Sequence, residues 1–153
     1  MPKAFGSTRF LTIFGVLLLT GCGEAVGPAK LPETVPFSGV VKIDGAPMNR
    51  GIITFIPKSD GGYNAVGFVN EKGEYKLKTS VGEMEGDGAA PGDYKVTISR
   101  FVKPSGEPQD PSVPAEIPGK ESIPLAYSDA TVSALTAVVP AGGGTKDFEV
   151  STK

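Results

Sequence analysis

Apolar residues in this chain occur in short runs that alternate with polar residues and end at glycine or proline. This pattern limits the fold more than any other feature of the sequence. Alternation with a period of two is typical of strands that bury one face. The 153 residues include 21 glycines and 14 prolines, a content that favours tight turns over helices. We therefore expect an all-β domain of about seven antiparallel strands, packed as a β-sandwich and without a helix.

The alternation predicts where these strands lie and which side chains they bury. The predicted strands cover residues 37–43, 52–56, 65–69, 74–79, 94–100, 133–139 and 145–151. Their expected inward residues are Phe37, Val41, Ile43, Ile53, Phe55, Tyr75, Leu77, Thr79, Tyr94, Val96, Ile98, Leu135, Ala137, Val139, Phe148 and Val150. Asp44-Gly45 and Asn70–Gly73 have the composition of tight turns, and the hairpin around Asn70–Gly73 carries the strongest turn signal.

Residues 103–124 interrupt the alternation because they contain six prolines. Proline lacks the backbone donor that a helix or a central strand needs. This Pro-rich segment must therefore run over the surface or extend freely into solvent. A connection of this length is usually functional or disordered, and the sequence leaves open whether the segment becomes ordered on binding a partner.

Four of the predicted segments together resemble a known family. Residues 38–45, 54–57, 70–77 and 91–98 are similar to carboxypeptidase regulatory-like domains, over roughly residues 36–100. Residues 123–129, with Ser133-Ala-Leu135, are similar to the closing segment of short lipoproteins of this type. The resemblance implies a transthyretin-like β-sandwich that is generally non-catalytic. It is informative about the fold and says little about function, and the Pro-rich insertion departs from the family pattern.

The first 21 residues have the features of an export signal. Lys3 and Arg9 precede an apolar run of about ten residues, Phe10–Leu19, which is too short to span a bilayer as a helix. The run ends in Leu19-Thr20-Gly21-Cys22, which resembles the lipobox of bacterial lipoproteins. The resemblance implies cleavage before Cys22 and attachment of a diacylglyceryl group to its sulfur.

This reading divides the chain into three parts. Residues 1–21 are the predicted signal peptide, residues 22–35 a flexible lipid-anchored tether, and residues 36–153 the β-sandwich domain. Acyl chains on Cys22 would hold the mature protein at a membrane surface. Gly23 stands where the family carries an inner-membrane retention aspartate, which favours the outer over the inner membrane. Cys22 is the sole cysteine, so no intramolecular disulfide can form.

Several functional classes are excluded by the residues that are missing. The chain has no histidine, which removes Ser-His and Cys-His nucleophiles and all histidine-based metal sites. Asp44 with Glu74 is a formal carboxylate pair for glycoside hydrolysis, but both lie in or beside predicted turns and no tryptophan offers a sugar-stacking surface. The net charge of −2, without a basic cluster, disfavours nucleic acid as a partner. We expect a non-enzymatic protein without a cofactor.

Two sets of residues remain as weak site candidates. Glu83, Glu85 and Asp87 match the early ligand spacing of a calcium loop, but position 94, where the last carboxylate should stand, is a tyrosine. We therefore predict a solvated acidic loop and no confident metal site. The four tyrosines could form a binding platform, yet core or rim packing fits their positions better. They are Tyr63, Tyr75, Tyr94 and Tyr127.

The functional expectation is a structural or protein-interaction module of the cell envelope, tethered through Cys22. The alternative is a ligand-binding accessory lipoprotein that holds a carbohydrate or Ca²⁺, in residues 82–88 or along 103–124. Envelope proteins and polysaccharide are the partners to consider besides the membrane. The sequence does not specify which residues would bind them.

Overall fold

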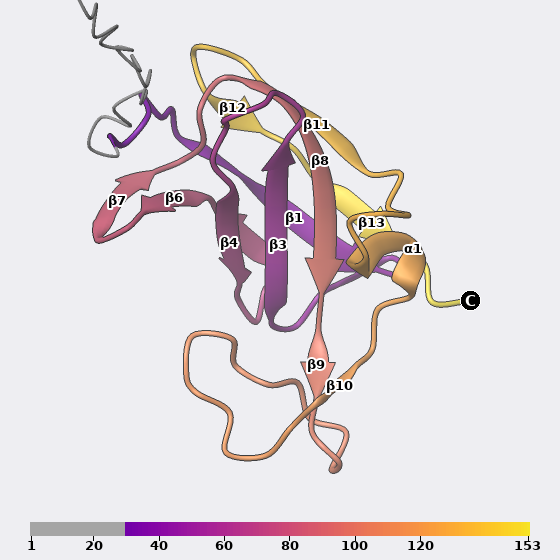
Figure 1. Ribbon diagram of the computed structural model, residues 1–153. Coiled ribbons are helices and arrows are strands. Elements are labelled where there is room, and N and C mark those ends of the chain that lie inside the picture. The colour runs from indigo at the N-terminus through magenta and orange to yellow at the C-terminus, as the bar shows by residue number, and fades with distance from the viewer. Residues whose placement is uncertain (1–29) are drawn as a thin grey trace, which may run out of the picture.

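The computed structural model describes residues 30–153, which form a mostly β domain with one short helix (Figure 1). The predicted signal peptide, Cys22 and the first part of the predicted tether lie outside the described residues. The elements are β1 (Phe37–Ile43), β2 (Ala46–Pro47), β3 (Gly51–Pro57), β4 (Ala65–Val69), β5 (Glu74–Lys76), β6 (Lys78–Val81), β7 (Met84–Asp87), β8 (Gly92–Ser99), β9 (Phe101–Val102), β10 (Lys120–Glu121), α1 (Leu125–Ser128), β11 (Thr136–Val139), β12 (Gly144–Thr145) and β13 (Phe148–Val150).

The larger sheet is antiparallel and has six strands in the order β11-β8-β3-β4-β6-β7. Its centre is β3, which pairs with β4 on one side and with β8 on the other. On β3 the side chains of Ile53 and Phe55 are fully buried, while those of the alternate residues are only partly buried. The sheet therefore has one core face and one outer face, as the period of two predicts.

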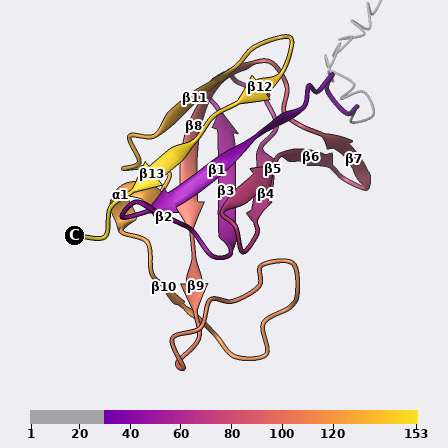
Figure 2. The same ribbon diagram turned by 180° about the vertical axis from the view of Figure 1, so that it is seen from behind.

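The second sheet is built around β1 and lies behind the first, as Figure 2 shows from the opposite side. β5 and β2 pair with β1 in antiparallel fashion, whereas β12 and β13 pair with it in parallel. The expectation of a purely antiparallel sandwich was therefore wrong for the C-terminal strands. The physical reason is connectivity: the chain reaches β12 from β11 in the other sheet, and such a crossover can place two strands side by side in the same direction.

One predicted strand, residues 74–79, is divided between the two sheets. The Asn70–Gly73 turn forms as predicted, with the Asn70 side chain accepting hydrogen bonds from the amides of Lys72 and Glu74. Beyond it β5 joins β1, whereas β6 joins β4. The crossing residue is Leu77, whose N–H donates to Phe37 and whose carbonyl accepts from Gly88. Leu77 thus keeps both of its peptide groups bonded while the chain passes between sheets.

Aromatic rings form the centre of the core between the two sheets. The ring of Phe55 lies 5.6 Å from that of Phe37, 5.7 Å from Tyr94, 6.0 Å from Phe148 and 6.3 Å from Tyr75, measured between centroids. All the predicted inward residues are buried except Ile43 and Leu135, which are partly buried and pack against the core. The buried Met48 was not predicted.

Three further segments differ from expectation. The chain contains a helix, α1, where none was expected; its single turn follows Pro124. Residues 80–90 are not a loop, because β6 and β7 pair as a hairpin in which Val81 lies opposite Met84. Val35, which we assigned to the tether, exchanges backbone hydrogen bonds with Ala89. The folded part of the chain therefore includes the residues just before β1.

The Pro-rich segment lies at the surface, one of the two arrangements that the sequence left open, but it is not structureless. β9, just before the segment, pairs with β10 inside it, and the two form a two-stranded ribbon below the two sheets (Figure 1). We refer to residues 103–119, between these strands, as the Pro-rich loop. The amide of Gln109 donates to the carbonyl of Phe101, and the Gln109 side chain donates to the carbonyl of Ile117, so the loop is braced across its own width.

Candidate functional site

The two carboxylates considered as a pair from the sequence bond to different neighbours. The Asp44 carboxylate accepts hydrogen bonds from Ser151 and from both the amide and the hydroxyl of Thr152. The bonds from Thr152 hold the pKa of Asp44 below its ordinary value of 3.8. Glu74 instead accepts from the side-chain amide of Asn70. Asp44 fastens the C-terminal residues to the β1–β2 turn, and Glu74 braces a different turn.

The acidic residues 83, 85 and 87 do not converge. Glu83 lies in the turn between β6 and β7, Glu85 is ion-paired with Lys78 at 3.1 Å, and Asp87 lies opposite Lys78 in the hairpin. Within residues 30–153, the structure shows no group of three acidic, histidine or cysteine side chains that could hold a metal ion. All three side chains are exposed, and the segment is a hairpin instead of the predicted loop.

The tyrosines predicted to pack in the core do so. Tyr75 and Tyr94 are each 2% exposed, and their hydroxyls donate to the carbonyls of Lys146 at 2.6 Å and Ala90 at 2.7 Å. Burial raises the pKa of both phenols. Tyr127 packs against the core and Tyr63 is exposed. Together they do not form a platform.

A large hollow lies where the chain crosses from one sheet to the other at Leu77. This groove has a volume of about 1070 Å³ and takes its walls from both sheets. Its most exposed apolar side chain is Phe68 on the outer face of β4, which is 53% exposed. We call it the Phe68 groove. Its other walls include Ser38, Val40, Asn64, Val66, Lys76 and Lys78.

Charges along the Phe68 groove nearly balance. Two lysines face three carboxylates, and Lys78 is already paired with Glu85. Asp147 accepts a hydrogen bond from the amide of Val40 at 2.8 Å. The other polar lining residues carry an amide or a hydroxyl group, namely Ser38, Asn64, Asn70, Tyr75, Ser80 and Thr145. The groove therefore suits an uncharged, hydrogen-bonding ligand better than a phosphate or a polyanion.

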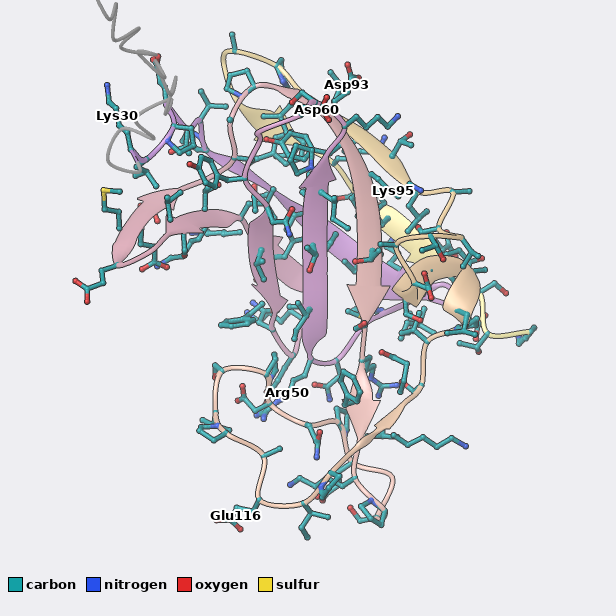
Figure 3. The ribbon with its side chains drawn as sticks, in the orientation of Figure 1. Lys30, Arg50, Asp60, Asp93, Lys95 and Glu116 are labelled. Carbon is teal, nitrogen blue, oxygen red and sulfur yellow. The ribbon has the colours of Figure 1, made fainter. Side chains whose placement is uncertain are left out.

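A second cluster lies beside the C-terminal end of β4 and is organised by Arg50 (Figure 3). The Arg50 guanidinium donates to Glu71 at 2.7 Å and to Asp110 of the Pro-rich loop at 2.9 Å. The bond to Glu71 raises the pKa of Arg50, and bonds from Ser112, with a smaller contribution from Arg50, lower the pKa of Asp110. Arg50 thereby fixes the loop to the turn that precedes β5. We call this arrangement the Arg50 clamp.

The Arg50 clamp leaves apolar residues of the loop in solvent. Val113 is 57% exposed and Ile117 is 56% exposed. Together with Arg50 and Pro114 they line a hollow of about 480 Å³. A smaller hollow, lined by both Phe68 and Arg50, connects this region to the Phe68 groove. The groove and the loop are thus parts of one continuous surface.

Sequence reasoning did not identify Phe68 or Arg50. Phe68 occupies an outward position of the predicted strand 65–69, so a large aromatic on a solvent face was the available signal. Arg50 gave no such signal, because its partners lie 21 and 60 residues away. The structure leaves both Lys76 and Phe68 exposed beside the crossing at Leu77, and no pattern in the sequence predicted that crossing.

Comparisons with protein-family models, with curated proteins and with solved structures found no match to this chain. Among residues 30–153, no helix has both the length and the apolar character needed to cross a membrane.

Proposed function

We propose that this chain is a lipid-anchored, exported, non-enzymatic module of the cell envelope that docks another envelope protein. The anchoring part of the proposal rests on the motif Leu19–Cys22 and the export signal before it. The assignment to the carboxypeptidase regulatory-like family rests on the strand and turn motifs, and it is supported by the two-sheet β arrangement.

The single observation that carries the docking function is the braced Pro-rich loop. Apolar side chains in a free loop would lose conformational entropy on binding, whereas a loop already held by hydrogen bonds loses less. Here Gln109 and the Arg50 clamp hold the loop, and Val113 and Ile117 remain exposed. Such an arrangement fits a preformed docking surface for a protein partner.

The docking function is tested by site-specific cross-linking in intact cells. A photoreactive residue at position 117 should capture a defined protein, and a photoreactive residue at Leu125 should not. Leu125 is the matched control because it is 70% exposed on α1, away from the loop. Arg50→Ala should abolish the capture at position 117 without unfolding the domain. Equal capture from both positions, or capture that persists in Arg50→Ala, would count against docking by a preformed loop.

The anchoring claim has a separate test. Cells grown with a palmitate analogue should label the wild-type protein and not Cys22→Ser. If Cys22→Ser still incorporated the label, Cys22 would not be the lipidated residue.

A second candidate, favoured by the Phe68 groove, is an accessory protein that binds a neutral saccharide. An exposed aromatic ring among amide and hydroxyl side chains can stack on a sugar ring while the polar groups bond its hydroxyls. Calorimetric titration with neutral envelope polysaccharide tests it, with Phe68→Ala as the variant that should lose binding. Absence of heat with the wild-type protein would remove this candidate. The acidic residues 83–87 give calcium no comparable support.

A further inference from the structure

β11 forms one end of the six-stranded sheet and has a free side. It pairs with β8, and within the described part of the chain no strand pairs with its other side. A strand at a sheet edge presents unpaired peptide groups that can bond to another strand. β11 is short, with four residues, and Pro140 follows it, but it lacks the charged side chains and the bulge that also prevent such pairing.

The register with β8 shows which peptide groups of β11 are free. The amide of Val96 donates to the carbonyl of Leu135, so these two residues form a hydrogen-bonded pair. Hydrogen-bonded and non-hydrogen-bonded pairs alternate along an antiparallel ladder. Ala137 therefore also bonds to β8, while Thr136 and Val138 direct their N–H and C=O groups away from it. No bond to these four groups occurs among residues 30–153.

Neither charge nor irregularity protects this edge. Residues 130–145 contain no charged side chain, and the four residues of β11 pair with β8 without a bulge. Val138 is 64% exposed. At the opposite end of the same sheet, β7 carries the charged residues Glu85 and Asp87. The side chain of Leu31, from the segment before β1, lies against Gly86 of this strand. Charged edge strands resist pairing with another strand, so the edge at β7 is protected by charge and the edge at β11 is not.

We propose that β11 pairs with β11 of a second copy of this chain, antiparallel and around a two-fold axis at Ala137. In this register Thr136 of each copy lies opposite Val138 of the other. Both residues have free peptide groups, so each such pair exchanges two hydrogen bonds. Because the axis passes through Ala137, the free peptide groups of β11 in one copy bond to the same groups in the other copy. The two six-stranded sheets then join into one continuous sheet.

The neighbouring charges agree with this register. Asp93 lies beside Val138 and Lys95 beside Thr136, on the outer face of β8. Figure 3 labels both residues on β8, next to the edge. Val138 lies opposite Thr136 of the second copy, so side chains from four adjacent strands form a row across the joined sheet. This row begins with Asp93 of one copy and ends with Lys95 of the other. No row places like charges at both ends, and the two charges of a row lie about 14 Å apart, so the charges on β8 do not oppose this register.

The contact is short, and we expect it to be weak in dilute solution. Two proteins held on one membrane surface meet at a much higher effective concentration, which would favour the pair. This last step rests on the proposed anchoring at Cys22. The pairing itself does not, because every group that makes it lies in β11 and β8.

Sedimentation velocity of the full chain in a mild detergent, over a series of concentrations, tests the pairing. The wild-type protein should pass from monomer to dimer as concentration rises. Val138→Lys should weaken association by about tenfold, since it places a charge in the shared edge. The matched control is Val132→Lys, because Val132 is 58% exposed and lies outside β11. A wild-type protein that stays monomeric, or a Val132→Lys variant weakened as much as Val138→Lys, would overturn the proposal.

Disulfide trapping tests the register. Thr136→Cys with Val138→Cys, in a Cys22→Ser background, should form a covalent dimer on oxidation, because Cα atoms in a hydrogen-bonded pair lie about 5.5 Å apart and can be bridged. Val132→Cys in the same background should remain monomeric, and equal cross-linking of the two would refute the register. The Cys22→Ser background lacks the proposed lipid site. If a covalent dimer forms in this background while the palmitate analogue does not label the wild-type protein, the pairing of β11 stands and the lipid anchoring at Cys22 is refuted.

Discussion

The two sides of β3 and β4 give the sharpest test of the fold, through two phenylalanines that differ in burial. Phe55 is fully buried, and its ring lies within 6.3 Å of four other aromatic rings. Phe55→Ala removes the ring and leaves a cavity that the two sheets cannot close. The free energy of unfolding should fall by about 3–5 kcal/mol. That is a large share of the roughly 5–15 kcal/mol that stabilises a typical domain.

The matched variant is Phe68→Ala, on the outer face of the same sheet. Phe68 is 53% exposed, so truncating it should change the free energy of unfolding by no more than about 0.5 kcal/mol. Urea unfolding gives the free energy of unfolding of both variants. Far-ultraviolet circular dichroism is the suitable probe, because the chain has no tryptophan to report by fluorescence. The midpoint should move strongly for Phe55→Ala and barely for Phe68→Ala. A large loss from Phe68→Ala would mean that the outer face is covered, which would refute the assignment of inner and outer faces.

Three further variants probe single interactions. Asp44→Asn should release the C-terminal residues from the β1–β2 turn. Hydrogen bonds from Thr152 lower the pKa of Asp44, so the stabilisation that its carboxylate gives is complete above the ordinary pKa of 3.8 and is lost as pH falls through the pKa in the folded protein. Hydrogen exchange of residues 150–153 should become faster in the variant at neutral pH and match the wild type in acid. Gly88→Ala should expose Val35 to proteolysis, since Gly88 has a φ of 93° and an added Cβ would meet the Val35 carbonyl; unchanged cleavage would contradict this. Tyr75→Phe should lower the free energy of unfolding by about 1–3 kcal/mol, because it removes the donor to the carbonyl of Lys146; thermal unfolding by circular dichroism would show whether it does.

The core could be predicted from the sequence because alternation is local. A period of two places Val96 and Ile98 inward whichever strand lies beside them, and both are fully buried. The turn at Asn70–Gly73 was predictable for the same reason, since its hydrogen bonds join residues that are close in the chain.

Pairing direction and sheet crossing could not be predicted in this way. Whether β13 lies parallel or antiparallel to β1 depends on the path of the chain between them, which leaves no periodic signal. Leu77 has the pattern of an ordinary inward residue, although its N–H bonds to Phe37 in β1 and its carbonyl to Gly88, the residue after β7. The Arg50 clamp was equally invisible, because it joins a left-handed residue to partners in two distant loops.

The parallel pairing of β1 with β13 has a mechanical consequence. β1 is the first strand after the N-terminal segment, and its hydrogen bonds to β5, β12 and β13 lie across the strand axis. A force pulling on the chain before residue 36 acts along that axis, so it shears these bonds together instead of unzipping them one after another. The domain should resist extension from its N-terminal end more strongly than extension from a loop, a difference that single-molecule pulling can measure.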